Sequence, residues 1–156
     1  MTKERILLLV LSVTYIVFLA WYDGWWMSPL TQSEVDAYLV NLRDDSEFGE
    51  MEEQIRQLGI TDDGEEMFMM NLNTYKAGAG EDPTANEDYQ TYGRGTLPLL
   101  LSRASHPIYY SEGIQTLMSP RYEEHWQEVF LVRYRSRRDF ISMITSDAYQ
   151  EVLPHR

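Results

Sequence analysis

The sequence of 156 residues contains no cysteine. This absence excludes disulfides, zinc ribbons, catalysis by a thiol and iron–sulfur clusters held by cysteine. Basic residues are also scarce, because 13 lysines and arginines stand against 25 aspartates and glutamates, giving a net charge of -12. Such a chain repels phosphate backbones and anionic lipid surfaces, so we expect no nucleic-acid partner.

Motifs typical of metal-binding and catalytic proteins are missing as well. Gly78 and Gly80 lack the strand and helix context of a dinucleotide-binding loop, and no GxSxG sequence is present. The histidines lie far apart in the chain and form no HxxxH pattern: His106, His125 and His155. We therefore predict no metal site and no cofactor.

Apolar and aromatic residues are plentiful, at 44% and 13% of the chain, which is enough for one packed domain. The longest apolar run, residues 6–22, carries no charge. Extended to Met27 as a helix it reaches about 30 Å, the thickness of a bilayer core. Aromatic residues that suit the headgroup layer gather at its end: Trp21, Tyr22, Trp25 and Trp26.

The charges around this run set its expected orientation. Lys3 and Arg5 precede it, and the next basic residue is Arg43. The positive-inside rule then predicts a cytoplasmic tail at 1–5, a transmembrane anchor at 6–27 in the inner or plasma membrane, and a periplasmic or extracellular domain. A cleaved signal peptide is the alternative, but no small-x-small motif lies near Ala20. We therefore expect a retained anchor.

Residues 28–64 are predicted to form a helical extension. Thr31 and Glu34 make a capping-box pattern at the start of one helix, with apolar positions at Val35, Tyr38, Leu39 and Leu42. After an acidic break at 44–49, a narrower apolar stripe follows, and Gly59 is expected as its C-cap. The sequence Asp62-Asp63-Gly64 is typical of a turn.

Residues 65–156 are predicted to form an α+β domain. In the strand expected at 67–75, Phe68, Met70 and Leu72 share one face, while the other carries Met67, Met69, Asn71, Asn73 and Tyr75. A helix then runs past Tyr89 and Tyr92 toward Leu101, weakened by glycines and a proline, and a second strand spans 107–113. Residues 67, 69 and 70 are methionines, and we interpret them as core filling because adjacent strand positions point to opposite faces.

The last segment, 128–156, is expected to organise the fold. An apolar strand beginning at Val129 leads into a helix whose start, Ser136 with Asp139, reads as a capping box. Asp147 is expected to cap a second short helix in which Tyr149 and Val152 face inward. Together these elements predict a small sheet with helices on one face.

Three segments give the chain a resemblance to the dimeric α/β-barrel, ferredoxin-like superfamily, and in it to small domains that resemble ethyl tert-butyl ether degradation proteins. They are MFMMNLNTYK, NEDYQTYGRGTLPLLLSRASHPIYYSEG and VFLVRYRSRRDFISMITSDAYQEVLPHR, with Asn71, Tyr92, Tyr149 and His155-Arg156 as the closest single matches. The resemblance implies a two-subunit barrel with a pocket between sheet and helices, in a superfamily that includes monooxygenases, isomerases and haem-using enzymes. In a haem-using branch His125 would be the ligand. The anchor and the helical extension depart from the compact family pattern.

Polar groups expected on one strand face predict a ligand pocket, formed by Asn71, Asn73, Tyr75, Tyr92 and Arg133. Alternatively, these groups satisfy one another or a dimer interface. If the pocket is catalytic, His106 or His155 would move a proton.

The basic cluster of this acidic chain is predicted to mediate interactions: Arg133, Arg135, Arg137 and Arg138. It is expected to pair with the acidic run 47–53 or with an acidic partner, unless it is a solvated helix start. Trp21, Trp25 and Trp26 are expected to contact the membrane or a membrane partner.

These observations favour a single-pass membrane-anchored accessory subunit of a membrane protein assembly, with its α+β domain outside the cytoplasm. The alternative is a membrane-tethered small-molecule binder or enzyme that uses the barrel pocket. A homodimer whose interface is its purpose is a third possibility, because interface residues resemble core residues in sequence.

Overall fold

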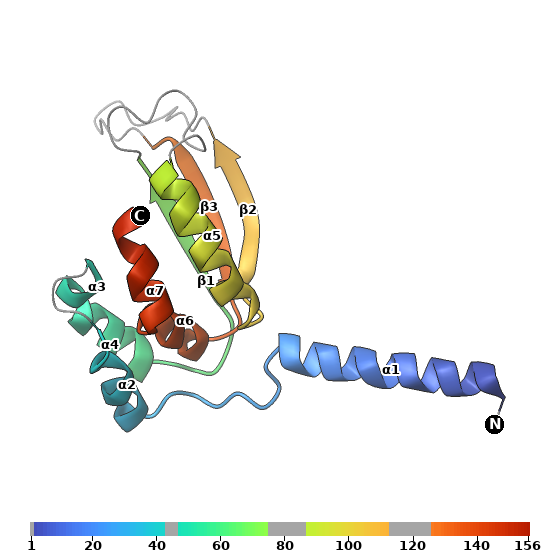
Figure 1. The fold of residues 1–156 in the computed structure, drawn as a ribbon. Coiled ribbons are helices and arrows are strands. Elements are labelled where there is room, and N and C mark those ends of the chain that lie inside the picture. The colour runs from blue at the N-terminus through green and yellow to red at the C-terminus, as the bar shows by residue number, and fades with distance from the viewer. Residues whose placement is uncertain (1, 43–46, 75–86, 113–125) are drawn as a thin grey trace, which may run out of the picture.

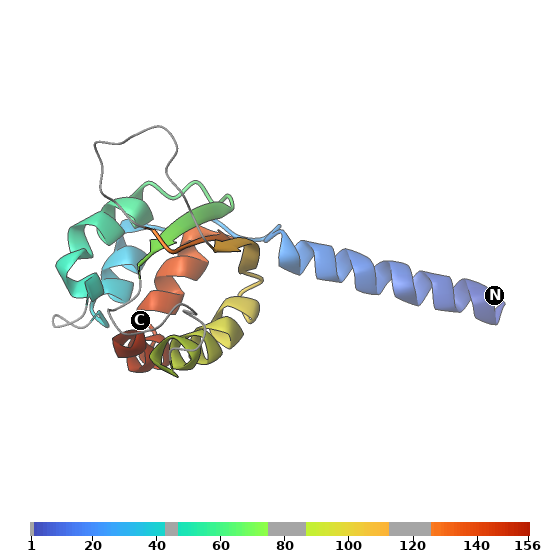
Figure 2. The same cartoon turned by 90° about the horizontal axis from the view of Figure 1, so that it is seen from above.

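The computed structural model describes residues 2–42, 47–74, 87–112 and 126–156. It is an α+β fold in which three antiparallel strands form a sheet of order β1-β3-β2 (Figure 1). The strands are β1 (Met67–Asn73), β2 (His106–Glu112) and β3 (Glu128–Tyr134). Between and after them come α5 (Glu87–Leu101), α6 (Arg137–Ile144), α7 (Asp147–Val152) and a short 3₁₀ turn (Leu153–His155). Figure 2 shows α5, α6 and α7 gathered on one side of the sheet, as the sequence predicted.

The N-terminal helix α1 (Lys3–Tyr22) projects away from this domain (Figure 1). Its mean hydropathy is 2.0, and only 6% of its most apolar segment is buried. At about 1.5 Å per residue it spans about 30 Å. This helix is therefore long and apolar enough to cross a membrane.

The helical extension contains α2 (Gln32–Leu39), α3 (Glu47–Glu50) and α4 (Glu52–Ile60). The capping box of Thr31 and Glu34 is confirmed, and the apolar side of α2 is buried, with Val35 fully inaccessible. The predicted turn at 62–64 is present, because Gly64 has a φ of +81° and its amide donates to the Asp62 carboxylate over 3.1 Å.

The prediction that Gly59 is a C-cap is wrong. Gly59 lies inside α4, and the residue that ends the helix is Thr61. A Cβ at position 59 would come within 2.7 Å of Val35 Cγ2 and 3.1 Å of Ile141 Cδ1. Glycine is needed here because α2, α4 and α6 approach one another closely, which a local sequence pattern does not reveal.

The two faces of the sheet differ in burial. The face that the helices cover is formed by four pairs between β1 and β3: Met67 with Tyr134, Met69 with Val132, Asn71 with Phe130, and Asn73 with Glu128. The intervening residues of β1 are exposed: Phe68 by 50%, Met70 by 63% and Leu72 by 38%. Within β1 the predicted alternation is therefore confirmed, while Tyr75 lies outside the described residues.

The helix α6 forms the centre of the core. Phe140, Ile141, Met143 and Ile144 are at most 4% exposed, and Ile141 and Ile144 are completely buried. Ser136 caps the helix, because its hydroxyl accepts from the Asp139 amide over 3.1 Å. The second half of the predicted capping box is not formed. Instead, the Asp139 carboxylate accepts from Arg135 and from the Ser136 hydroxyl. The cap of α7 is Ser146, where Asp147 was predicted, because the Ser146 hydroxyl accepts from the Tyr149 amide.

The Glu34 carboxylate links α2 to α6, and this contact should make the stability of the fold depend on pH. Hydrogen bonds from Arg138, at 2.6 and 3.2 Å, and from the Thr31 amide lower the pKa of Glu34 from 4.5 to about 2. Because the folded-state pKa is depressed, this stabilisation is present above pH 4.5 and is lost as the pH falls toward 2. We expect Glu34→Gln to unfold at lower denaturant concentration than wild type at pH 7, and the two midpoints to converge as the pH falls from 4.5 to 2. A midpoint difference that persists at pH 2 would contradict this account.

Candidate functional site

A cavity of about 680 Å³ lies between the covered face of the sheet and the helices α4, α5 and α7. Most of its wall is apolar, from Ile55 and Leu58 of α4, Leu100 of α5, and Val132 of β3. This volume is in the range of small-molecule sites, which are typically apolar with a few fixed polar groups. The cavity is therefore the candidate functional site.

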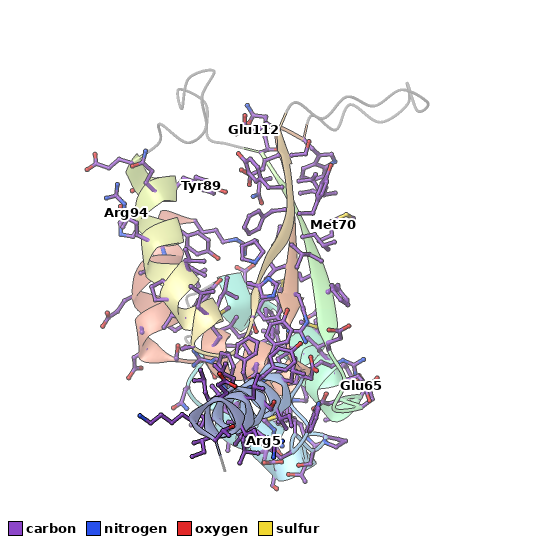
Figure 3. All side chains as sticks on the ribbon, turned by 90° about the vertical axis from the view of Figure 1, so that its right-hand side faces the viewer. Arg5, Glu65, Met70, Tyr89, Arg94 and Glu112 are labelled. Atoms are coloured by element: carbon purple, nitrogen blue, oxygen red, sulfur yellow. The ribbon has the colours of Figure 1, made fainter. Side chains whose placement is uncertain are left out.

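One end of the cavity carries a hydrogen-bonded group around a buried carboxylate. Glu128 at the start of β3 has no exposed surface. Its Oε1 accepts from Asn73 Nδ2 over 2.6 Å and from the Tyr89 hydroxyl over 2.8 Å. Figure 3 shows the Tyr89 side chain extending from α5 toward the strands. Sequence reasoning missed Glu128, although its position opposite Asn73 follows once the register is known.

A pair of tyrosines forms a second polar group of the wall. The Tyr92 and Tyr149 hydroxyls are 2.8 Å apart, and the two rings meet edge to face. Burial raises the pKa of Tyr149 well above its ordinary value, and burial does the same for the pKa of the neighbouring Tyr134. The Tyr149 and Tyr134 hydroxyls therefore remain protonated at neutral pH.

Thr96 of α5 is another polar residue of the wall that sequence reasoning missed. The residue lines the cavity and is 7% exposed, while its Oγ1 is itself buried. In the part of the chain that the structure describes, its Oγ1 has no hydrogen-bond partner. An unsatisfied buried hydroxyl is uncommon and calls for a physical explanation.

His155 and Arg156 reach the cavity at the C-terminal end of the domain. The His155 Nδ1 lies 2.9 Å from the Asp88 carboxylate at the start of α5. Of the two histidines proposed for proton transfer, His155 thus borders the cavity. His106 stacks on Tyr22, and its Nε2 lies 2.7 Å from the Tyr22 hydroxyl, on the exposed side of the sheet.

The structure brings Asn71, Asn73 and Tyr92 to the cavity, as predicted, but it does not bring Arg133 there. Arg133 lies on the other face of β3, because it follows Val132, whose side chain points into the cavity. Its guanidinium binds the Glu66 carboxylate over 2.6 Å and the Ala104 carbonyl over 3.1 Å. Tyr75 lies outside the described residues.

Arg133 and Arg135 form a junction with the end of α1, which we call the arginine junction. Arg135 donates to the Trp21 carbonyl over 2.9 Å, and Arg133 donates to the Tyr22 carbonyl over 3.4 Å. The Arg133 guanidinium also lies 4.3 Å from the centre of the Tyr22 ring. The last carbonyls of a helix lack intrahelical partners and carry partial negative charge, so guanidinium groups suit this position.

Within one chain, the ion pairs that the structure describes for the basic cluster do not involve the acidic run 47–53, and pairing with that run between subunits stays a prediction. Arg135 binds Asp139, Arg137 lies 3.7 Å from Asp63, and Arg138 binds Glu34. In the acidic run, Glu52 pairs with Arg56 of its own helix. The cluster therefore ties β3 and α6 to α1, α2 and the turn after α4.

The tryptophans expected at the membrane differ in their surroundings. Trp25 and Trp26 are more than 60% exposed, beyond the end of α1. Trp21 packs near Phe18, and its ring centre lies 6.0 Å from the Arg135 guanidinium. The rings of Trp25 and Trp26 are therefore exposed, whereas Trp21 contributes to the arginine junction.

Metal ligands do not converge among the described residues. In 2–42, 47–74, 87–112 and 126–156, no group of three or more histidines and carboxylates is placed to hold a metal ion. His125, the residue that a haem-using branch would employ, lies outside these ranges.

Two glycines of α5 provide a matched pair for testing the cavity wall. A Cβ at Gly93, which lines the cavity, would meet nothing within 4 Å, whereas a Cβ at Gly95 would come within 2.4 Å of Val152 Cγ1. We expect Gly93→Ala to stabilise the protein by about 0.5–1 kcal/mol through helix propensity. Gly95→Ala should destabilise it by about 1–2 kcal/mol, because overpacking outweighs that gain. Denaturant unfolding checks both values, and equal effects at the two sites would contradict the packing described.

Comparisons with known proteins place the chain beside one protein without an assigned activity, which two crystal structures describe. No protein-family model matches it, and no curated protein matches it. The crystal structure of the RPA0582 protein of unknown function from Rhodopseudomonas palustris is 28% identical, with a TM-score of 0.55, covering 68% of this chain and 80% of that one. The crystal structure of methylated RPA0582 protein is 26% identical, with a TM-score of 0.55, covering 74% of this chain and 84% of that one.

Proposed function

We propose that this chain is a membrane-tethered small-molecule-binding protein. The observation that carries the proposal is the cavity of about 680 Å³, whose largely apolar wall includes the polar side chains of Asn71 and Tyr92. Concave, mostly apolar pockets with a few polar groups are typical of small-molecule sites, and this cavity has that character.

The fold that we propose for residues 65–156 is ferredoxin-like, with three of its four strands present among the described residues. Two features support it: the element order β1-α5-β2-β3-α6, and the antiparallel sheet order β1-β3-β2. In that superfamily a pocket lies between sheet and helices, which is the place of the cavity in this chain.

The test of the binding proposal is whether the cavity carries a molecule in cells. The full-length chain is extracted in mild detergent, denatured, and its released small molecules are identified by mass spectrometry. Gly93→Leu serves as the control, because the added side chain occupies open space at the cavity wall without a clash at its Cβ. We expect a molecule that wild type releases and the variant does not. Identical profiles from two equally stable proteins would sink the proposal.

For the localisation we propose that α1 spans the inner or plasma membrane at 6–27, with residues 1–5 in the cytoplasm and the domain outside. The absence of native cysteine makes a single introduced thiol a clean reporter. Val40 is 83% exposed, so Val40→Cys should react with a membrane-impermeant maleimide in intact cells, while Thr2→Cys should react only after lysis. The reverse pattern would show the opposite topology.

A second candidate function is that of an accessory subunit, which includes self-association. The uncovered face of the sheet favours it, because Phe68, Met70, Leu72 and Tyr109 are exposed there by 38–63%. Figure 3 shows Met70 on the side of the sheet away from α5. Exposed apolar faces of this kind mark protein interfaces, and a second copy would pair the sheets into a two-subunit barrel.

A short bismaleimide applied to Met70→Cys in native membranes tests this second candidate. A homodimer yields a crosslinked pair of this chain, and an accessory subunit yields a crosslink to another protein. Val40→Cys is the control, since Val40 is the C-cap of α2, which lies away from the sheet (Figure 1). If both variants crosslink equally, the uncovered face is not the interface.

A further inference from the structure

Exposed apolar and aromatic side chains gather where the end of α5 meets β2, and we call this edge of the domain the α5–β2 margin. It consists of Leu97 and Leu101 of α5 with Ile108 and Tyr110 of β2, which are 44–52% exposed. The two leucines are four residues apart, so they share one face of the helix. Exposed apolar groups that cluster in this way are typical of surfaces that contact another molecule or a membrane.

The segment that carries the margin has no acidic residue, although the chain as a whole is strongly acidic. Between Asp88 and Glu112 the sequence contains no aspartate and no glutamate, and its arginines are Arg94 and Arg103. The surface of a membrane is commonly anionic, so it repels carboxylates and accepts apolar, aromatic and basic groups. The composition of this segment therefore suits contact with a bilayer better than that of the rest of the chain.

The end of α1 lies against the link between α5 and β2. The Tyr22 hydroxyl is 2.7 Å from Nε2 of His106, the first residue of β2. Arg133 donates both to the Ala104 carbonyl, in the link, and to the Tyr22 carbonyl. Figures 1 and 2 show that α1 leaves the domain on the side of β2 and of the end of α5. A bilayer spanned by α1 would therefore meet the α5–β2 margin.

The margin also adjoins the apolar end of the cavity. Leu97 lines the cavity, and so does Pro107, which precedes Ile108 and pairs with Val132. The charged groups belong to the opposite end, near the start of α5: Asp88, His155, Arg156 and the buried Glu128, which Tyr89 contacts. Asp88 and Leu97 are about 14 Å apart along α5, at about 1.5 Å per residue.

The exposed residues of the cavity wall differ in character between the two ends. Away from the margin they are mostly polar: Gln54, Thr74, Asp88 and Arg156, with Leu72 on β1, the strand at the other edge of the sheet. Beside the margin they are Leu97 and Gly93, and a Cβ at Gly93 would meet nothing within 4 Å. An apolar molecule that reaches the cavity past α5 thus keeps apolar contacts along its way.

We infer that the α5–β2 margin rests on the bilayer, and that the cavity exchanges a lipophilic molecule with the bilayer at this margin. The inference rests on the proposed binding function and on the proposed membrane span of α1, and it adds the source of the ligand. Apolar side chains are stabilised at the boundary between headgroups and acyl chains, and a lipophilic molecule that passes there does not have to enter water.

Two photoreactive alcohols that carry the same diazirine group test the inference on the full-length protein in phosphatidylcholine nanodiscs. The hexadecyl alcohol stays in the bilayer, and the butyl alcohol is supplied from water. Mass spectrometry maps the labelled residues after irradiation, and the labelling of α1 reports how much hexadecyl alcohol the bilayer holds.

Three variants are compared with wild type in this experiment. Leu101→Glu places a charge on the margin at a residue outside the cavity wall. Phe68→Glu is the matched control, because Phe68 has a similar exposure but lies on the uncovered face of the sheet. Gly93→Leu narrows the cavity itself.

We expect the hexadecyl alcohol to label Leu101 and Ile108 at the margin and Leu97 and Leu100 in the cavity wall. Leu101→Glu should lower its labelling of the cavity about fivefold and leave that of α1 unchanged, because a carboxylate loses hydration when it enters the lipid boundary. Phe68→Glu should change neither. Gly93→Leu should lower labelling of the cavity and preserve that of the margin.

The other outcomes separate this inference from the proposals on which it rests. A margin without label beside a labelled α1 would overturn the inference, and so would equal effects of Leu101→Glu and Phe68→Glu on the cavity. If the butyl alcohol labels the cavity and the hexadecyl alcohol does not, the ligand comes from water, and the inference fails while the binding function stands. If neither alcohol labels the cavity, the binding function fails as well. If α1 itself stays unlabelled, the proposed span fails, and the inference with it.

Discussion

Replacing Asp139 by alanine should lower the free energy of unfolding by about 3–5 kcal/mol, because it leaves the Arg135 charge buried without its partner. The two carboxylate oxygens of Asp139 each accept from Arg135 over 2.8 Å. The side chains of this pair are only 10% and 7% exposed, so solvent screens the attraction little. Asp139 also accepts from the Ser136 hydroxyl over 3.0 Å, which the substitution removes.

Denaturant unfolding of the full-length protein in mild detergent, followed by tryptophan fluorescence, measures this loss. The control is Asp36→Ala, which removes an ion pair with Arg56. The side chain of Asp36 is 51% exposed. Exposed pairs are worth at most about 1 kcal/mol, so the control should unfold close to wild type. In the double variant Arg135→Met with Asp139→Leu, part of the stability should return, because no buried charge remains. Similar losses at Asp139 and Asp36 would show that the Arg135–Asp139 pair is solvated.

Ile141→Ala should cost about 2–5 kcal/mol, because it opens a cavity where three helices meet. Ile141 is completely buried in α6, and its Cδ1 packs against Gly59 of α4. Ile141→Val removes only that methyl group and should cost about 0.5–1.5 kcal/mol. The same unfolding measurement applies, with Val40→Ala as a control because Val40 is 83% exposed.

The geometry around Gly59 sharpens this second prediction. Gly59→Ala adds a methyl group that meets Val35 and Ile141, so alone it should destabilise by about 1–3 kcal/mol. Combined with Ile141→Val, the added and removed methyl groups partly offset each other, and the double variant should lose less than the sum of the two single losses. Strict additivity would mean that the two positions do not touch.

Elements with local signals were predictable from the sequence. Thr31 and Glu34 hydrogen-bond to each other's backbone amides within four residues. The start of α2 could therefore be predicted without knowledge of tertiary contacts. The alternation of β1 likewise separated Asn71 and Asn73 from Met70 correctly, because strand periodicity is independent of the partner strand.

Features that depend on contacts between distant elements were not predictable. Residues 129–132 are all apolar, so they show no alternation that would tell the two faces of β3 apart. The face of the sheet on which Arg133 lies follows only from the pairing of β3 with β1. Gly59 resembled a C-cap because glycine ends many helices, whereas its real constraint comes from Val35 and Ile141. The unpaired hydroxyl of Thr96 could not be inferred, since a threonine in a helix usually satisfies itself.

The arginine junction has a mechanical consequence. Arg133 and Arg135 donate hydrogen bonds to the carbonyls at the end of α1. Arg133 belongs to β3, the central strand of the sheet, and Arg135 follows directly after that strand. The connection between α1 and the sheet is therefore braced by side-chain hydrogen bonds. A rotation of α1 about its axis would be transmitted as torque to β3, and through its pairing with β1 and β2 to the wall of the cavity. Conversely, a molecule that spreads the sheet from α5 would exert a force on α1.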